Sequence, residues 1–395
     1  MTRSVGNAVT DEGLPLDLDA PKRNGRAMKS EGGILPGHEI AALVATGAIA
    51  AERPVVDGQI QPASLDLRLG ARAWRVRASF LPGPHRKVAE CLAKLNALEV
   101  NLDNEQGAVL ERNCVYIAEV EESLALSSSL SAAANPKSST GRLDVFTRVI
   151  TDRADRFDII KEGYAGKLYA EVSPRTFPVL ARRGSRLAQL RLRNGEARLD
   201  DDKLAELHER ETLVAGLNPS FAAGIAVSVD LAGTNASSVI GYRAKNHTGL
   251  IDVDRRSGYV VDEFWEAIPA RPDRSLILDP GEFYILASKE AVQVPPDYAA
   301  EMVPFDPLVG EFRVHYAGFF DPGFGHAAAG GHGSRAVLEV RSRDVPFILE
   351  DGQTVARLVY ERLTERPNAL YGTELGSYYQ AQGLKLSKHF RARVV

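Results

Sequence analysis

The sequence predicts a mainly β protein made of two homologous halves with a few short helices. Its 34 glycines and 21 prolines indicate many turns, which is typical of β-rich folds. Three anchors recur 168 residues further along the chain, namely Tyr116 as Tyr284, Glu171 as Glu339 and Gly184 as Gly352. A repeat at fixed spacing decides the architecture before any single motif does, so two related β-rich halves are expected.

The elements follow in chain order. Residues 1–33 are polar and lack apolar periodicity, which predicts a flexible tail. Pro36–Gly47 places apolar residues at helical spacing before a glycine stop and predicts one short helix. Ser64–Leu69 alternates as a half-buried strand does, and the charged stretch 200–211 predicts a solvated linking helix. The predicted division is 1–33 as tail, 34–192 as first half, 193–219 as linker, 220–365 as second half and 366–395 as C-terminal segment.

Composition excludes several classes of protein. None of the apolar runs approaches the roughly 18 residues of a membrane span, and the acidic N-terminus does not resemble a signal peptide, so a cytoplasmic protein is expected. A formal net charge of −4 argues against nucleic-acid binding. Cys91 and Cys114 are too few for a disulfide framework or a paired-cysteine metal site.

One loop in the first half carries the groups that hold phosphate oxygens. Within Asn135–Leu143, Lys137 supplies a point charge and Arg142 a planar donor fork. The small residues Ser138 and Ser139 allow backbone amides to approach an anion closely. A loop of this kind is by itself more often only a turn.

This loop resembles the Arg-Ser-Ser-Leu-Ala-Arg-Leu-Gly signature of the dCTP deaminases, which belong with the dUTPases to one superfamily. Lys137 replaces the first arginine, and Asp144 stands where a glycine is expected. Other stretches resemble further landmarks of the family in the same order: Ser64–Gly70, Arg156–Asp158, Gly163–Glu171, Arg183–Leu190, Phe320–Gly323, Ala336–Glu339 and Tyr379–Gly383. The resemblance covers about 34–192 and 222–390, and it implies tandem dUTPase-like barrels of the β-clip, distorted jelly-roll type.

The resemblance also implies roles for individual residues. Glu171 or Glu339 would relay protons, and Ser138 would orient the attacking water. Residues 379–383 would belong to a lid that closes over the substrate, whereas 304–308 lack the hydroxyl pair expected of a phosphate loop. Substrate contacts are expected from Lys137, Ser139, Arg142, Arg156, Asp158, Gln189, Asp321, Tyr371, Gln380 and Gln382.

The two glutamates compete for the catalytic role. Glu171 is favoured because its own half keeps the phosphate loop, Arg156 and Asp158. In the alternative arrangement, the loop of the first half serves Glu339 and the lid of the second half. Burial beside apolar neighbours would raise the pKa of either carboxyl group toward the operating pH.

The expected reaction is dCTP + H₂O → dUTP + NH₃, in pyrimidine deoxynucleotide metabolism. The His-x-Glu and Pro-Cys-x-x-Cys patterns of zinc deaminases do not occur, so a zinc-independent route is expected, with Mg²⁺ bound through the triphosphate. The resemblance implies a homo-oligomer, with a trimer favoured, and dTTP as a candidate feedback ligand. The alternatives are a dUTP pyrophosphatase, a bifunctional enzyme or a non-catalytic nucleotide-binding regulator. Thr248–Asp254 resembles a dUTPase element but is out of order, and it is interpreted as coincidence.

Overall fold

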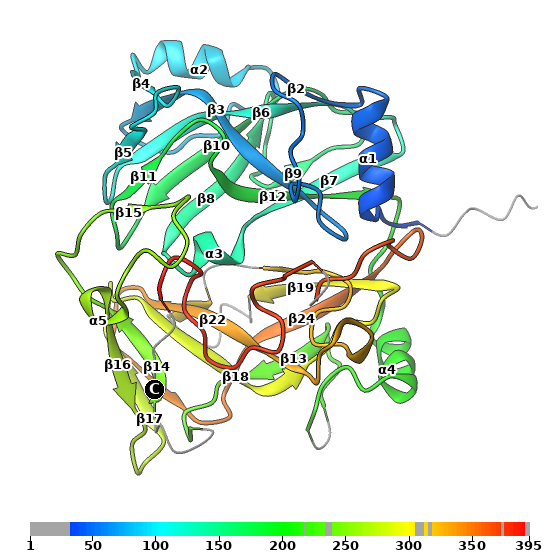
Figure 1. Cartoon of the computed structure of the whole chain (residues 1–395), viewed down its shortest axis with the longest axis vertical. Coiled ribbons are helices and arrows are strands. Elements are labelled where there is room, and N and C mark those ends of the chain that lie inside the picture. The colour runs from blue at the N-terminus through cyan, green and yellow to red at the C-terminus, as the bar shows by residue number, and fades with distance from the viewer. Residues whose placement is uncertain are drawn as a thin grey trace, which may run out of the picture. The chain divides into compact units, whose positions relative to one another are not determined.

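The computed structural model describes residues 32–216, 219–233, 239–304, 312–314, 318–372 and 375–391. In its first half, one large sheet runs in the order β8-β10-β6-β3-β12-β7-β9, and β1, β2 and β4 pair with β12, β6 and β3 (Figure 1). The bounds are β1 Gly33–Ile34, β2 Ile49–Ala51, β3 Leu65–Val76, β4 Leu98–Asn101, β6 Val115–Ala125, β7 Leu130–Pro136, β8 Val145–Thr151, β9 Ile159–Ile160, β10 Ala165–Pro174 and β12 Arg186–Asn194.

The described part of the second half contains sheets in the orders β13-β24-β19-β21 and β16-β14-β18-β22-β20, with the pair β17-β23. Its strands are β13 Ile225–Ser228, β14 Val239–Ala244, β16 Trp265–Pro269, β17 Ser275–Leu278, β18 Tyr284–Val292, β19 Tyr298–Pro304, β20 Phe312–Val314, β21 Phe319–Phe320, β22 Ser334–Ser342, β23 Phe347–Glu350 and β24 Thr354–Arg362. A further sheet, β15-β11-β5, joins the halves through β5 Ala108–Leu110, β11 Val179–Ala181 and β15 Ile251–Asp252.

The strand registers confirm the predicted duplication. Glu171 on β10 lies opposite Ile117 on β6, and Glu339 on β22 lies opposite Ile285 on β18. Both pairings keep the spacing seen in the sequence, so each half contains the same antiparallel frame. Because side chains alternate along a strand, equal register gives the two glutamates equivalent positions in their sheets.

Short helices connect these strands. The predicted first helix is α1, Gly37–Ala45, and the linking helix is α4, Asp201–Arg210, which begins where the Asp200 carboxylate accepts a hydrogen bond from the Lys203 amide. Leu204 and Leu207 of α4 are buried in the second core, so the helix is packed on one face. The remaining described helices are α2 Val88–Lys94, α3 Ser138–Gly141, α5 Val261–Phe264 and the 3₁₀ turn η2 Ala327–Ala329.

Buried polar contacts join the two halves. Arg191 on β12 is 1% exposed and donates to the carbonyl oxygens of Ala300 and Phe320 in the second half. The stretch Thr248–Asp254 also has a structural role, because Asp252 and Asp254 both accept hydrogen bonds from Arg182 of the first half. These contacts fix the surfaces that face each other across the junction.

Within the described residues, no helix is both long enough and apolar enough to cross a membrane.

Candidate active site between the two halves

A cavity of about 330 Å³ is lined by residues of both halves, among them residues of α3 and of the C-terminal segment. Its first-half wall includes Asp66, Lys137, Ser138, Ser139, Arg142, Arg186 and Gln189. Its second-half wall includes Arg256, Phe319, Phe320, Asp321, Phe324, Val337, Glu339, Tyr371, Tyr379, Gln382 and Lys388. The structure therefore brings the predicted phosphate loop together with the glutamate of the other half.

The loop reaches the cavity because α3 is a tight turn attached to a strand. The Lys137 amide donates to the Leu187 carbonyl of β12, and the Lys137 carbonyl accepts from the amides of Thr140 and Gly141. This one-turn helix directs Ser138 and Ser139 toward the cavity. Small residues suit the turn, since a bulky side chain would obstruct close approach of an anion to the backbone.

Cationic side chains gather in the wall of the cavity. Lys137 and Arg186 both pair with the buried carboxylate of Asp66, Arg186 at 3.4 Å. Burial, together with the nearby positive charges of Lys137 and Arg256, lowers the pKa of Lys388 to about 8. An anionic ligand would relieve this mutual repulsion, so the cluster suits a phosphate chain.

Glu339 is the buried carboxyl group of the cavity. It is 4% exposed, and burial raises its pKa to about 8, although the positive charge of Arg142 acts in the opposite direction. Arg142 Nε lies 3.8 Å from Glu339 Oε1. A carboxyl group with this pKa can both accept and release a proton near neutral pH, which is the property that acid–base catalysis requires.

The C-terminal segment also contacts the guanidinium group of Arg142. Its guanidinium lies 4.0 Å from the centre of the Tyr379 ring, and Nη1 donates to Gln382 Oε1 at 3.1 Å and to the Lys385 carbonyl at 2.9 Å. The predicted lid thus contacts the predicted phosphate loop directly. These contacts fix the orientation of Arg142 beside Glu339.

Three other predicted residues of the second half have distinct surroundings. Asp321 lines the cavity and lies 3.4 Å from Arg191, while the Tyr371 hydroxyl accepts a hydrogen bond from the Tyr379 amide. Gln380 does not line the cavity. Its side chain accepts from the Gly325 amide and donates to the Gly323 carbonyl, so it supports the hairpin that carries Asp321.

Glu171 lies in different surroundings from Glu339. Its Oε1 accepts from Arg148 at 2.6 Å, and its Oε2 accepts from the Ser79 hydroxyl at 2.5 Å. The structure does not bring Glu171, Arg156 or Asp158 to the cavity: Arg156 is exposed, and Asp158 accepts from the Val149 amide, with its pKa raised to about 7 by burial. The second-half segment 305–308 lies outside the described residues.

Sequence reasoning did not include three of the cations in this cavity, Arg186, Arg256 and Lys388, among the substrate contacts. Arg186 belongs to the quoted stretch Arg183–Leu190, but Ala188 and Leu190 at the alternate positions are apolar, so the alternation of the strand did not single it out. Arg256 lies in a loop of the second half, and the sequence around it carries no recognisable signal. Arg256 reaches the cavity only through the packing of the two halves.

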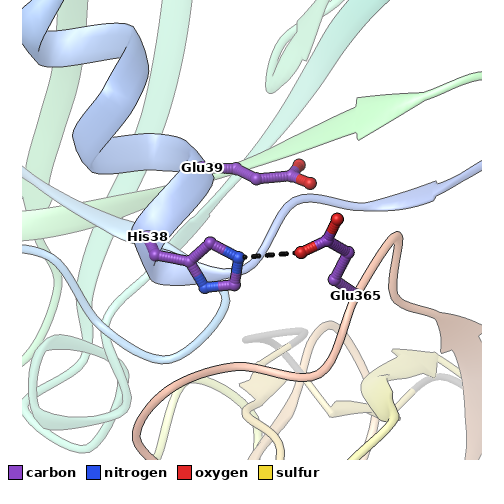
Figure 2. Close-up of side chains that lie close together, drawn as sticks. All are labelled: His38, Glu39 and Glu365. Carbon is purple, nitrogen blue, oxygen red and sulfur yellow. Dashed lines mark hydrogen bonds and ion pairs between the residues drawn. The ribbon is translucent and has the colours of Figure 1, made fainter.

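Among the described residues, one group of His, Cys, Asp or Glu side chains has the spacing of a metal site, and it lies outside the cavity. Figure 2 shows His38 and Glu39 of α1 beside Glu365, with His38 Nε2 3.2 Å from a Glu365 oxygen. Glu39 accepts from the Thr364 hydroxyl at 3.0 Å. These contacts form a polar bridge between α1 and the end of the second half, and we assign no ion to them.

Fold and cavity together define a class: a duplicated β-barrel protein with a cavity between its halves that is lined by cationic side chains. Family models named 2'-deoxycytidine 5'-triphosphate deaminase (DCD) N-terminal domain and C-terminal domain match residues 31–196 and 200–390. A crystal structure of 2'-deoxycytidine 5'-triphosphate deaminase from Agrobacterium tumefaciens is 60% identical, with a TM-score of 0.81 over 85% of this chain and 99% of that one. The chain belongs to the 2'-deoxycytidine 5'-triphosphate deaminase family.

More distant relatives match a shorter part of the chain. A protein of Halobacterium salinarum named "dCTP deaminase, dUMP-forming" is 34% identical over 31% of this chain and 60% of its own length. One of the same name from Beutenbergia cavernae is 31% identical over 30% of this chain and 60% of its own length. The chain therefore spans about 60% of the length of these curated relatives.

Proposed function

We propose that this chain catalyses the hydrolytic deamination of dCTP to dUTP and ammonia. The observation that carries the proposal is the pairing, in one cavity, of a buried carboxyl group with a raised pKa and a cluster of cationic side chains. A pyrimidine base would lie toward Glu339, and the triphosphate would contact the cations. Family membership and the printed names of the relatives support the same reaction.

Glu339 is the proposed proton relay. As water attacks C4 of cytosine, the ionised carboxylate accepts a proton from the water and passes it to N3. The carboxylate then takes the second proton of the bound hydroxyl group and delivers it to the departing amino group, which leaves as ammonia. Each step returns Glu339 to its starting form, so one well-placed carboxyl group suffices.

The remaining groups position the reactants. Ser138 would orient the attacking water, and Arg142 would oppose the effect of burial on Glu339, so that enough of the carboxylate is ionised to act as a base. The contacts of Glu171 with Arg148 and Ser79 favour a structural role for that residue. The proposed site is therefore the composite one, with its loop from the first half and its glutamate from the second.

The phosphate chain would be held by Lys137, Ser139, Arg186 and Lys388. We propose that Mg²⁺ is bound through the triphosphate, where it would neutralise part of the phosphate charge. The chemistry of the cavity carboxylates fits this arrangement, because Asp66 is paired with Lys137 and Arg186, and Asp321 with Arg191. No zinc ion takes part in the proposed mechanism.

A second candidate is a bifunctional enzyme that releases dUMP from dCTP. The name "dCTP deaminase, dUMP-forming" of the relatives from Halobacterium salinarum and Beutenbergia cavernae favours it. This reaction would also require water to attack the α-phosphate with release of pyrophosphate. The two candidates differ in product, which a direct assay can separate.

The test is to incubate the purified chain with dCTP and Mg²⁺ and to measure ammonia, dUTP, dUMP and pyrophosphate together. Ammonia and dUTP in equal amounts are the expected result. Ammonia with equal dUMP and pyrophosphate would favour the bifunctional enzyme. Binding of dCTP without ammonia release would overturn the proposal in favour of a nucleotide-binding regulator.

We further propose a cytoplasmic homo-oligomer, with a trimer as the expected assembly. Its mass in solution, measured by light scattering with and without dTTP, would test both the assembly and the feedback ligand.

A further inference from the structure

We infer that Ser387 and His389 are positioning residues that hold the peptide carbonyl of Ser139 in place. The inference deepens the proposed function and rests on it, since Ser139 belongs to the loop of the same cavity. Neither residue appears among the expected substrate contacts. Their role follows from the hydrogen bonds of the short turn α3.

Within α3, most carbonyl oxygens accept hydrogen bonds from the backbone. The Ser138 carbonyl accepts from the Arg142 amide and the Thr140 carbonyl from the Leu143 amide. The Ser139 carbonyl accepts instead from the Ser387 hydroxyl at 2.7 Å. Since a buried carbonyl needs a partner, the C-terminal segment completes the bonding of the loop.

His389 fixes the position of Ser387. Both residues are buried, at 1% and 2% exposure, and His389 Nδ1 lies 2.8 Å from Ser387 Oγ. The other ring nitrogen, Nε2, lies 2.8 Å from the Val253 carbonyl, to which it can only donate. Burial lowers the pKa of His389 to about 4, so the ring is neutral and Nδ1 accepts, which means that Nδ1 and the Ser139 carbonyl share the single proton of the Ser387 hydroxyl. Contacts through Val253, His389, Ser387 and Ser139 therefore link a loop of the second half to the phosphate loop of the first.

The same segment also holds the far end of the turn. Arg142 follows α3 and donates to Gln382 and to the Lys385 carbonyl. One bond at Ser139 and two at Arg142 thus set the orientation of the whole turn relative to Glu339. Because Ser138 and Arg142 both act from this turn, a small rotation of the Ser139 peptide would disturb the reacting groups, whereas the phosphate contacts of Arg186 and Lys388 come from outside the turn.

The experiment compares Ser387→Ala, Ser387→Thr and His389→Phe with the unchanged chain, using steady-state ammonia release from dCTP. We expect Ser387→Ala and His389→Phe to lower kcat about tenfold. KM should change by less than about threefold, because the cationic contacts remain. Ser387→Thr keeps the hydroxyl group and should restore most of kcat. Ser123→Ala is the matched control, since the Ser123 hydroxyl also donates to a carbonyl, that of Ala50, on the first barrel.

A second readout distinguishes positioning from general loss of structure. Phe390 packs edge-on against Trp265 with ring centres 5.8 Å apart, so in a Trp74→Phe background Trp265 fluorescence reports whether the segment is in place. Lower kcat with unchanged emission supports the inference. Unchanged kcat, or lower kcat with a red-shifted emission, overturns it. An unchanged chain that releases no ammonia would instead refute the proposed function.

Discussion

Arg142 Nε and Glu339 Oε1 lie 3.8 Å apart, although the two residues come from different halves of the chain. Both side chains are buried, so the charge of each is felt strongly by the other. Burial alone would keep Glu339 protonated at neutral pH, and the guanidinium opposes that effect. Arg142 of the first half thus lowers the pKa of Glu339, the proposed acid–base group of the second half.

Glu339→Gln is expected to lower kcat for ammonia release by about a thousandfold, because the amide cannot relay protons. Glu171→Gln is the matched control at the equivalent register of the first half. It should keep kcat within about threefold and mainly lower stability, by about 2 kcal/mol, since the pair with Arg148 is weakened. Steady-state kinetics and thermal unfolding of both variants check this. A larger kinetic loss in the Glu171 variant would return the catalytic role to that residue.

The pH dependence of kcat/KM should be bell-shaped with its maximum near pH 8. Glu339, whose pKa is raised to about 8 by burial, must lose its proton to act as a base, so activity rises as pH approaches that value. Lys388, whose pKa is lowered to about 8, loses its charge above it and should bind the triphosphate less well. Lys388→Arg keeps the charge and should remove the alkaline decline. An alkaline decline that persists in this variant would exclude Lys388 as its source.

Glu339→Gln should stabilise the protein increasingly between pH 5 and pH 8. The folded state holds the Glu339 proton up to about pH 8, whereas the unfolded chain releases it near its ordinary value, so unfolding becomes easier as pH rises through this window. Glutamine does not titrate and so avoids this loss of stability, which amounts to roughly 4 kcal/mol at pH 8. Denaturant unfolding of both chains at the two pH values measures the difference. Equal differences at pH 5 and pH 8 would contradict the raised pKa.

Arg142→Gln should move the acidic limb of the pH profile to higher pH, because the charge that lowers the pKa of Glu339 is lost. Arg142→Lys keeps that charge but replaces the planar fork that contacts Gln382 and the Lys385 carbonyl. Arg142→Lys should shift the acidic limb of the pH profile less than Arg142→Gln does, and it should still lower kcat about tenfold. Profiles of kcat/KM for the two variants separate the effect of charge from that of geometry. Identical limbs in both would show that Arg142 does not adjust Glu339.

Arg191→Met should destabilise the junction of the two halves by about 3 kcal/mol, since it leaves buried acceptors without their donor. The Ala300 and Phe320 carbonyls and the Asp321 carboxylate would each lose a contact. Arg198→Met, an exposed arginine nearby in sequence, should have little effect. Unfolding midpoints in urea check both, and similar midpoints for Arg191→Met and the unchanged chain would refute the role given to Arg191.

The sequence by itself determined the mainly β class, the duplication and which residues form the phosphate loop. Repeated anchors and alternating strands are local patterns, and the registers of β10 with β6 and of β22 with β18 reproduce them. Lys137, Ser138, Ser139 and Arg142 could be assigned together because they share one turn. The sequence suffices for such a loop because its residues follow one another in the chain and are therefore close together in space.

Only the tertiary structure decided which groups share the cavity. The sequence offers both Glu171 and Glu339 and favours Glu171. In the structure Glu171 contacts Arg148 and Ser79, and the junction of the halves places Glu339 beside Arg142. Arg256 and the contact of Ser387 with Ser139 likewise join residues distant in the chain. Desolvation and pairing depend on neighbours in space, and packing between the halves chooses those neighbours.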